Sequence, residues 1–301
     1  MTSVHSDVAR VVQRLAVLLG AGVAPAAAWG YLDDPSVGEV ASAATSGQSI
    51  PAAIAAVAGG AEAPASPWQG LAIAWAVATE AGAPLAPTLR EFAASLRDLA
   101  QAEREISVAL AAPAATARLV LVLPAIGLLF GMLLGFNTLG TLLSTPVGWV
   151  CLALGGGLMI GAARWNARMV KAARVTDSTP GLQFDLLAIA VSGGGSLDRA
   201  RATVASAMTR YSGVPPAEIV TDDGIDAVLE LSRRAGVPAA ELLRSEAIEL
   251  RRAARADAQE RAERLSVRLM IPLGVCVLPA FMLLSVVPLL ISVVSSTSIR
   301  W

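Results

Sequence analysis

The chain has 301 residues, of which 55% are hydrophobic and 16% charged, and its mean hydropathy is +0.61. It is too apolar for a typical soluble domain and too charged for a wholly embedded transporter, so we expect membrane and aqueous parts. The net charge of −1 argues against nucleic acid as the main partner, because phosphate binding needs a basic excess.

The N-terminal stretch carries Arg10 and Arg14 before an apolar run, which is the pattern of a signal peptide. Its valines and leucines instead recur at helical spacing on one face, and a similar stretch returns at residues 187–200, where no signal could act. We therefore predict an amphipathic first helix over residues 7–19.

Further helices are expected from near Pro25, over residues 49–58 and over residues 68–80. Gly82 should end the last of these, because a residue without Cβ adopts the left-handed cap conformation, and Pro84 should start the next helix. Such a short turn predicts an antiparallel pair of helices.

Three apolar runs are long enough to cross a bilayer as helices, and they cover residues 114–136, 146–164 and 267–294. The loop at 137–145 has no charged residue. Arginines instead lie near the start of the first run, after the second run and before the third run. By the positive-inside rule the N-terminal part and residues 165–266 are cytoplasmic, and the loop and the tail at 295–301 lie outside.

The aqueous parts contain an internal repeat. Residues 15–17 (LAV) are echoed by 187–189 (LAI), and EAGAPLAPTL at 80–89 is echoed by RAGVPAAELL at 234–243. Gly236 and Pro238 thus repeat the turn of Gly82 and Pro84. The sequence predicts an all-α membrane protein with two homologous cytoplasmic helical bundles, at residues 1–113 and 165–266, and three transmembrane helices.

Glycines four residues apart in the spans leave a flat groove that lets another helix approach closely. The predicted packing residues are Gly127, Gly131, Gly135, Gly157 and Gly161. Glycine is also common in membrane helices in general, and the packing partner could be span two of the same chain. No acidic residue, lysine or histidine lies inside a span, which argues against proton- or ion-coupled transport.

The sequence offers few residues suited to catalysis or to metal binding. His5 is the only histidine, and Cys151 and Cys276 both lie in apolar spans. The glycines at 193–195 lack the lysine of a phosphate loop, and the paired aspartates at 33–34 and 222–223 open expected helices, where aspartate is a common cap. We predict no catalytic residue, no cofactor and no metal site, although a cation held by scattered carboxylates stays open.

The long charged helix of the second copy, over residues 239–268, is more polar than its counterpart over 85–110. A charged helix face is usually only solvated. The divergence nevertheless suggests different neighbours for the two copies, and the residues that we select as a possible partner surface are Glu80, Arg233, Arg234 and Arg244.

Residues 78–124, ATEAGAPLAPTLREFAASLRDLAQAEREISVALAAPAATARLVLVLP, resemble the type II secretion system F-domain family (GspF/PilC-like). With LGTLLSTPVGW and ARWNARMVKAA, the chain is most similar to the TadB and TadC proteins of actinobacterial Tad (Flp) pilus systems. One departure is that the acidic residue before the turn, Glu80, has Arg234 as its counterpart in the second copy.

The resemblance implies a non-enzymatic platform in the cytoplasmic (inner) membrane. Such a platform contacts a cytoplasmic assembly ATPase, a homologous platform subunit or itself, and pilin-like subunits. The alternatives are a small-molecule transporter or channel, which the uncharged spans disfavour, and a membrane-anchored signalling adaptor, which would not need the doubled layout.

Overall fold

The computed structural model describes residues 4–59, 66–133, 138–172, 180–212, 223–268, 271 and 273–291, and the regular structure in these ranges is helical. The chain divides into two compact units. Unit 1 comprises Met1–Arg104 and Val175–Ala256, and unit 2 comprises Glu105–Arg174 and Asp257–Trp301. The prediction of an all-α protein is confirmed for the described residues.

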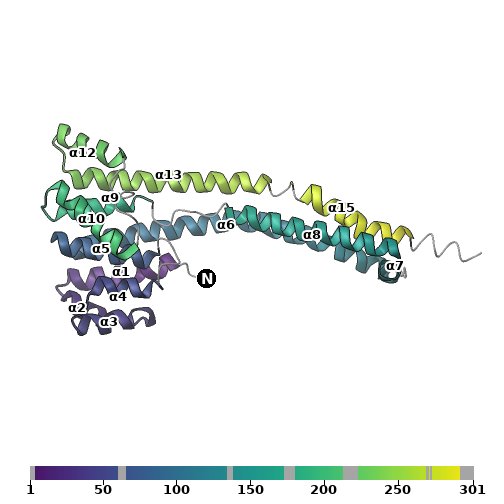
Figure 1. The fold of residues 1–301 in the computed structure, drawn as a ribbon, viewed down its shortest axis with the longest axis horizontal. Helices are drawn as coiled ribbons and strands as arrows, with labels where there is room; N and C mark the ends of the chain where they lie inside the picture. The colour runs from purple at the N-terminus through teal and green to yellow at the C-terminus, as the bar shows by residue number, and fades with distance from the viewer. Residues whose placement is uncertain are drawn as a thin grey trace, which may run out of the picture. The chain divides into compact units, whose positions relative to one another are not determined.

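The helices follow one another along the chain as Figure 1 labels them. Those that lie wholly in unit 1 are α1 (Val4–Gly20), α2 (Pro25–Ala28), η1 (Trp29–Tyr31), η2 (Pro35–Val37), α3 (Gly38–Thr45), α4 (Ile50–Val57), α5 (Pro67–Ala81), α9 (Leu182–Ser192), α10 (Leu197–Ser212) and α12 (Asp223–Ala235). Two helices have residues in both units, α6 (Leu85–Leu133) and α13 (Ala239–Arg268). Those in unit 2 are α7 (Thr138–Ser144), α8 (Pro146–Ala172), η3 (Leu273–Val277), α15 (Leu278–Phe281) and η4 (Met282–Val286).

Helix α5 is the centre of unit 1. It packs against α1, α4, α9 and α10, and every residue from Pro67 to Ala78 is buried. This burial follows from a sequence that is apolar on all faces, since such a helix must be covered all round. A capping box of Ser66 and Gln69 starts the helix.

One hydrophobic core runs through unit 1. It includes Leu15, Trp29 and Trp75 from the first part of the chain together with Leu186 and Leu243 from the second part. The rings of Trp29 and Trp75 pack with their centroids 5.5 Å apart, tilted by 46°. The two segments that we expected as separate bundles therefore share a core.

Most helices expected from the pattern are present. Those over 7–19, 49–58 and 68–80 correspond to α1, α4 and α5 within three residues at each end. The helix near Pro25 is only four residues long, and α3 was not predicted, because its small residues give a weak pattern. The predicted external loop at 137–145 also contains a helix, α7.

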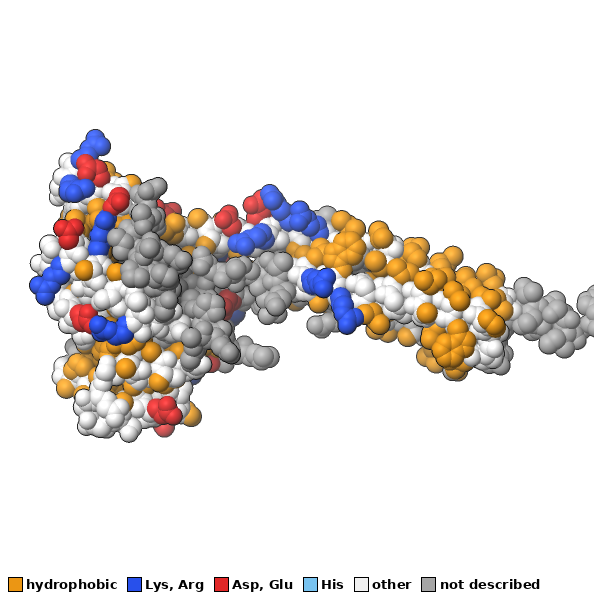
Figure 2. Space-filling model, viewed as in Figure 1, with side chains coloured by type: hydrophobic (Ala, Val, Ile, Leu, Met, Phe, Trp, Pro, Cys, Tyr) orange, Lys and Arg blue, Asp and Glu red, His pale blue; other side chains and the backbone are white. Residues whose placement is uncertain are grey.

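Unit 2 is organised around α8, which packs against α7, η3, α15 and η4. Large apolar side chains of this unit face outward, among them Phe130, Trp149, Leu154 and Leu278 at 62%, 59%, 56% and 64% exposed. Figure 2 shows hydrophobic side chains over much of the visible face of α8 and α15. An apolar exterior is what a lipid environment requires.

Two helical segments are long and apolar enough to cross a membrane, Pro146–Met169 and Gly274–Ile291, and only 22% of the apolar 18-residue window in each is buried. The expected first span is represented among the described residues by the shorter apolar stretch Val122–Leu133, which falls short of the roughly 20 residues that a crossing needs. The described residues thus give two candidate spans where the sequence predicted three. Both are far from the N-terminus and mostly unburied, unlike a signal sequence or a soluble core helix.

Candidate functional site

The two Gly-x-Pro turns have nearly the same backbone conformation. Gly82 has φ 72° and Gly236 has φ 69°, both in the left-handed region, and a Cβ added at either would meet nothing within 4 Å. The requirement for glycine is therefore conformational, as a left-handed helix cap demands. Pro84 and Pro238 each lie one residue before the helix that follows, α6 and α13.

The C-terminal end of α5 lies against the turn between α9 and α10. A Cβ added at Gly193 would lie 1.9 Å from the carbonyl oxygen of Ala81, so only glycine allows this approach. Next to it, Arg210 Nη1 donates to Glu80 Oε1 at 3.0 Å. The predicted partner residue Glu80 is thus in contact with the second part of the chain.

Arg244 also contacts neighbouring helices of its own unit. Its Nε donates to Glu91 Oε2 at 2.9 Å and its Nη2 donates to Ser192 Oγ at 3.3 Å. Arg233 pairs with Glu230 at 2.8 Å on the same helix, and Arg233 and Arg234 are both exposed on α12. The structure therefore places Glu80 and Arg244 at contacts between the two parts of unit 1, and leaves Arg233 and Arg234 open to an outside partner.

An ion pair between α13 and α9 was missed by the sequence interpretation. Arg251 Nη1 donates to Asp185 Oδ2 at 2.6 Å, and the two side chains are 14% and 20% exposed. Burial raises the pKa of Asp185, and the charge of Arg251 opposes this shift. The signal that could have found it is a lone carboxylate in the largely apolar stretch LQFDLLAIAV.

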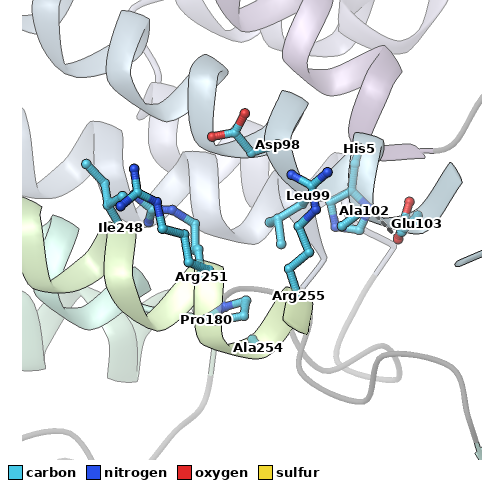
Figure 3. A pocket seen from close by; sticks show the side chains of 11 residues that line it. His5, Asp98, Leu99, Ala102, Glu103, Pro180, Ile248, Arg251, Ala254 and Arg255 are labelled. Atoms are coloured by element: carbon cyan, nitrogen blue, oxygen red, sulfur yellow. Dashed lines mark ion pairs between the residues drawn. The ribbon is translucent and has the colours of Figure 1, made fainter. Parts of the chain in front are cut away.

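A cavity of about 300 Å³ lies between α1, α6 and α13. Its charged lining has both signs, and Figure 3 shows Arg255 reaching from α13 toward Leu99 and His5. His5 Nδ1 pairs with Glu103 Oε1 at 2.9 Å, while its Nε2 is buried and has no hydrogen-bond partner among the described residues. Within the described ranges there is no group of three ligand side chains that could hold a metal ion.

The predicted packing glycines of unit 2 divide into two groups. Gly127 lies against the last helical segment, where an added Cβ would come within 2.8 Å of Ser285 Oγ. The same hydroxyl donates to the carbonyl of Pro124 at 2.9 Å in a buried position. Gly131 is also buried, and Gly135 lies outside the described residues.

The two predicted glycines of α8 do not touch the neighbouring segments. A Cβ added at Gly157 or Gly161 would meet nothing within 4 Å, whereas one at Gly155 would lie 2.5 Å from Leu284 Cγ. Close approach to α8 therefore uses Gly155, which the sequence did not single out. A packing role for Gly157 and Gly161 stays a prediction.

The first of the two turns, at Gly82, lies in a segment that matches a known protein family. Residues 11–133 match the model of the family "Type II secretion system (T2SS), protein F". The match runs from α1 to the end of α6 and covers about two fifths of the chain. It supports the resemblance derived from the sequence for the first bundle, the Gly82 turn and the apolar part of α6. No curated protein matches the chain.

Proposed function

We propose that this chain is a non-enzymatic inner-membrane platform protein of a type II secretion or type IV (Tad/Flp-like) pilus machine. The observation that carries the proposal is the family match over residues 11–133, which ends together with the apolar part of α6. The all-helical unit 1 and the lipid-compatible exterior of unit 2 support it.

The proposed topology has the N-terminal segment (1–113) and residues 165–266 in the cytoplasm, three spans at 114–136, 146–164 and 267–294, and the loop 137–145 and tail 295–301 outside. It is supported by exposed arginines beside the apolar helices, namely Arg164 and Arg168 on α8 and Arg264 and Arg268 on α13. Figure 2 shows basic side chains gathered at one end of the apolar surface. Positive charge on one side is typical of the cytoplasmic face.

In this role unit 1 docks on a cytoplasmic assembly ATPase, and unit 2 packs with pilin-like subunits and with a homologous platform subunit or a second copy. Unit 1 suits the role because its parts share one core and are joined by the pairs Glu80–Arg210 and Glu91–Arg244. Of the predicted surface residues, Arg233 and Arg234 are those available for docking.

Cysteine accessibility tests the topology. In a Cys151→Ala/Cys276→Ala background, single cysteines replace the exposed Ser42, Ser144 or Ser206. A membrane-impermeant maleimide added to intact cells should label the Ser144 position alone. Labelling of only one of positions 42 and 206 would overturn the proposal, because both bundles must share one side of the bilayer.

Copurification tests the partner. The full chain should retain the assembly ATPase of its own machine, and Arg233→Glu/Arg234→Glu should weaken the complex while Arg199→Glu, exposed on α10, should not. The transporter alternative instead predicts solute flux through liposomes that contain this chain alone. Retention of the ATPase by both variants would remove α12 as the docking surface.

A further inference from the structure

A groove of about 430 Å³ between α1 and α6 carries an unusual concentration of positive charge. Four of the eight residues that line it are arginines, and none is acidic. The lining consists of Ser6, Ala9, Arg10, Gln13, Arg14, Arg97, Ala100 and Arg104. It is separate from the residues that we assigned to ATPase docking.

Helices α1 and α6 run antiparallel, so the arginines of both helices line the same groove. His5 pairs with Glu103 at one end, and a Cβ added at Gly20 would lie 3.9 Å from the Cβ of Ala86 at the other. Arg97 and Arg104 are seven residues apart on α6, so they share a face with a spacing of about 10 Å along the axis. Arg10 and Arg14 are one turn apart on α1, a spacing of about 6 Å.

The positive charge of the groove is only partly compensated. Arg14 and Arg97 make no hydrogen bond or ion pair with the described residues and are both exposed. Arg10 Nη2 donates to Asp7 Oδ1 at 2.5 Å.

The other groups near the groove offset its positive charge only in part. Arg104 donates to the neutral amide of Gln101. The charges of Arg10 and Arg14 reach Asp34, whose pKa is lowered chiefly by hydrogen bonds from Ser36 and further by these two arginines. One wall also holds a buried amide oxygen that the described residues leave unsatisfied. The side-chain oxygen of Gln13 is buried, and none of the described residues donates a hydrogen bond to it, although buried polar groups are usually satisfied.

We propose that this groove binds an acidic helical segment of a partner protein. A helix that presents carboxylates at i, i+4 and i+7 repeats the spacings of about 6 and 10 Å found on α1 and α6. Arginine is the side chain best suited to carboxylates, and an amide on the same segment would donate to Gln13. A single phosphate would reach only one part of so long a row of charges. The inference does not depend on the chain being a platform protein.

The test measures binding of a fluorescent alanine-based peptide with glutamates at i, i+4 and i+7 to the full-length protein in detergent micelles. The matched peptide carries glutamine at the same positions. We expect the acidic peptide alone to bind, and Arg14→Gln/Arg97→Gln to raise its Kd about tenfold or more. The control Arg199→Gln/Arg261→Gln removes the same charge from exposed sites outside the groove and should leave the Kd unchanged.

Three outcomes would overturn the inference. They are equal binding of the two peptides, equal weakening by the control variant, and displacement of the peptide by pyrophosphate at a concentration below the peptide Kd, which would indicate a small-anion site. Arg14→Lys/Arg97→Lys keeps the charge but loses the planar fork of donors, so it should bind the acidic peptide more weakly than the wild type and more tightly than Arg14→Gln/Arg97→Gln.

Discussion

Helices α5 and α6 meet at Gly82, and helices α12 and α13 meet at Gly236 with nearly the same φ. We call these two helix pairs, α5–α6 and α12–α13, the hairpins. Positions 154 residues apart are buried in both, as for Trp75 and Leu229 at 1% and 3% exposed, and for Leu89 and Leu243, both at 0%. The internal repeat itself stays a prediction from the sequence.

The hairpins differ on their remaining faces. Val77 is 0% exposed, whereas the position 154 residues later, Leu231, is 54% exposed. The reason is position in the unit, because α5 has α1, α4, α9 and α10 around it. The comparison shows that the same glycine turn occurs in a central and in a peripheral hairpin. The neighbouring helices decide how much of each helix is buried.

The largest expected effect is loss of the central aromatic pair. Trp75→Ala should lower the free energy of unfolding by about 3–5 kcal/mol, because it leaves a cavity beside Trp29. Leu231→Ala in the peripheral hairpin should change it by less than about 0.5 kcal/mol. Denaturant titration of the full chain in detergent, followed by circular dichroism, measures both. A large loss for Leu231→Ala would mean that the outer face of α12 is covered.

The two turn glycines should respond equally. Gly82→Ala and Gly236→Ala should each cost about 1–2 kcal/mol of unfolding free energy, because alanine is strained at positive φ and neither site has a steric clash. Gly30→Ala is the control, since its Cβ also meets open space and its φ is not positive. A cost at one turn several times that at the other would break the comparison.

A smaller effect is expected for the pair that joins the hairpins. A double-mutant cycle with Glu91→Gln and Arg244→Gln should give a coupling energy of about 0.2–1 kcal/mol, because the side chains are 50% and 33% exposed. The coupling should shrink at high salt. The same cycle on Glu80 and Arg210 provides the comparison, and a coupling that is insensitive to salt would show that these contacts are not electrostatic.

The smallest effect is a pH dependence of opposite sign in the two parts of the chain. The raised pKa of Asp185 means that the folded state holds its proton more tightly, so stability falls as pH rises from 3.8 through the folded pKa. The lowered pKa of Asp34 means that its contribution is present above 3.8 and is lost as pH falls through the folded pKa.

Unfolding free energies measured from pH 2 to pH 7 test these signs. The wild type minus Asp185→Asn should decrease with rising pH, and the wild type minus Asp34→Asn should increase. Slopes of the same sign would contradict the assignment, whatever the absolute cost of either substitution.

Sequence alone determined the features that depend on near neighbours along the chain. The helical class, the caps at Gly82 and Gly236 and the apolar runs at 146–164 and 267–294 follow from hydrophobic period, Cβ sterics and segment length, which are local properties. The sequence interpretation missed helices where the local signals are weak. Helix α3 was not predicted, and α7 occupies a predicted loop.

Only the tertiary structure decided which distant residues meet. It placed α5 at the centre of one core shared by both segments, used Gly155 rather than Gly157 for close approach to Leu284, and brought Glu80 and Arg244 into ion pairs within the unit. Nothing in the local pattern fixes such choices, because burial and pairing depend on which faces of different helices come together.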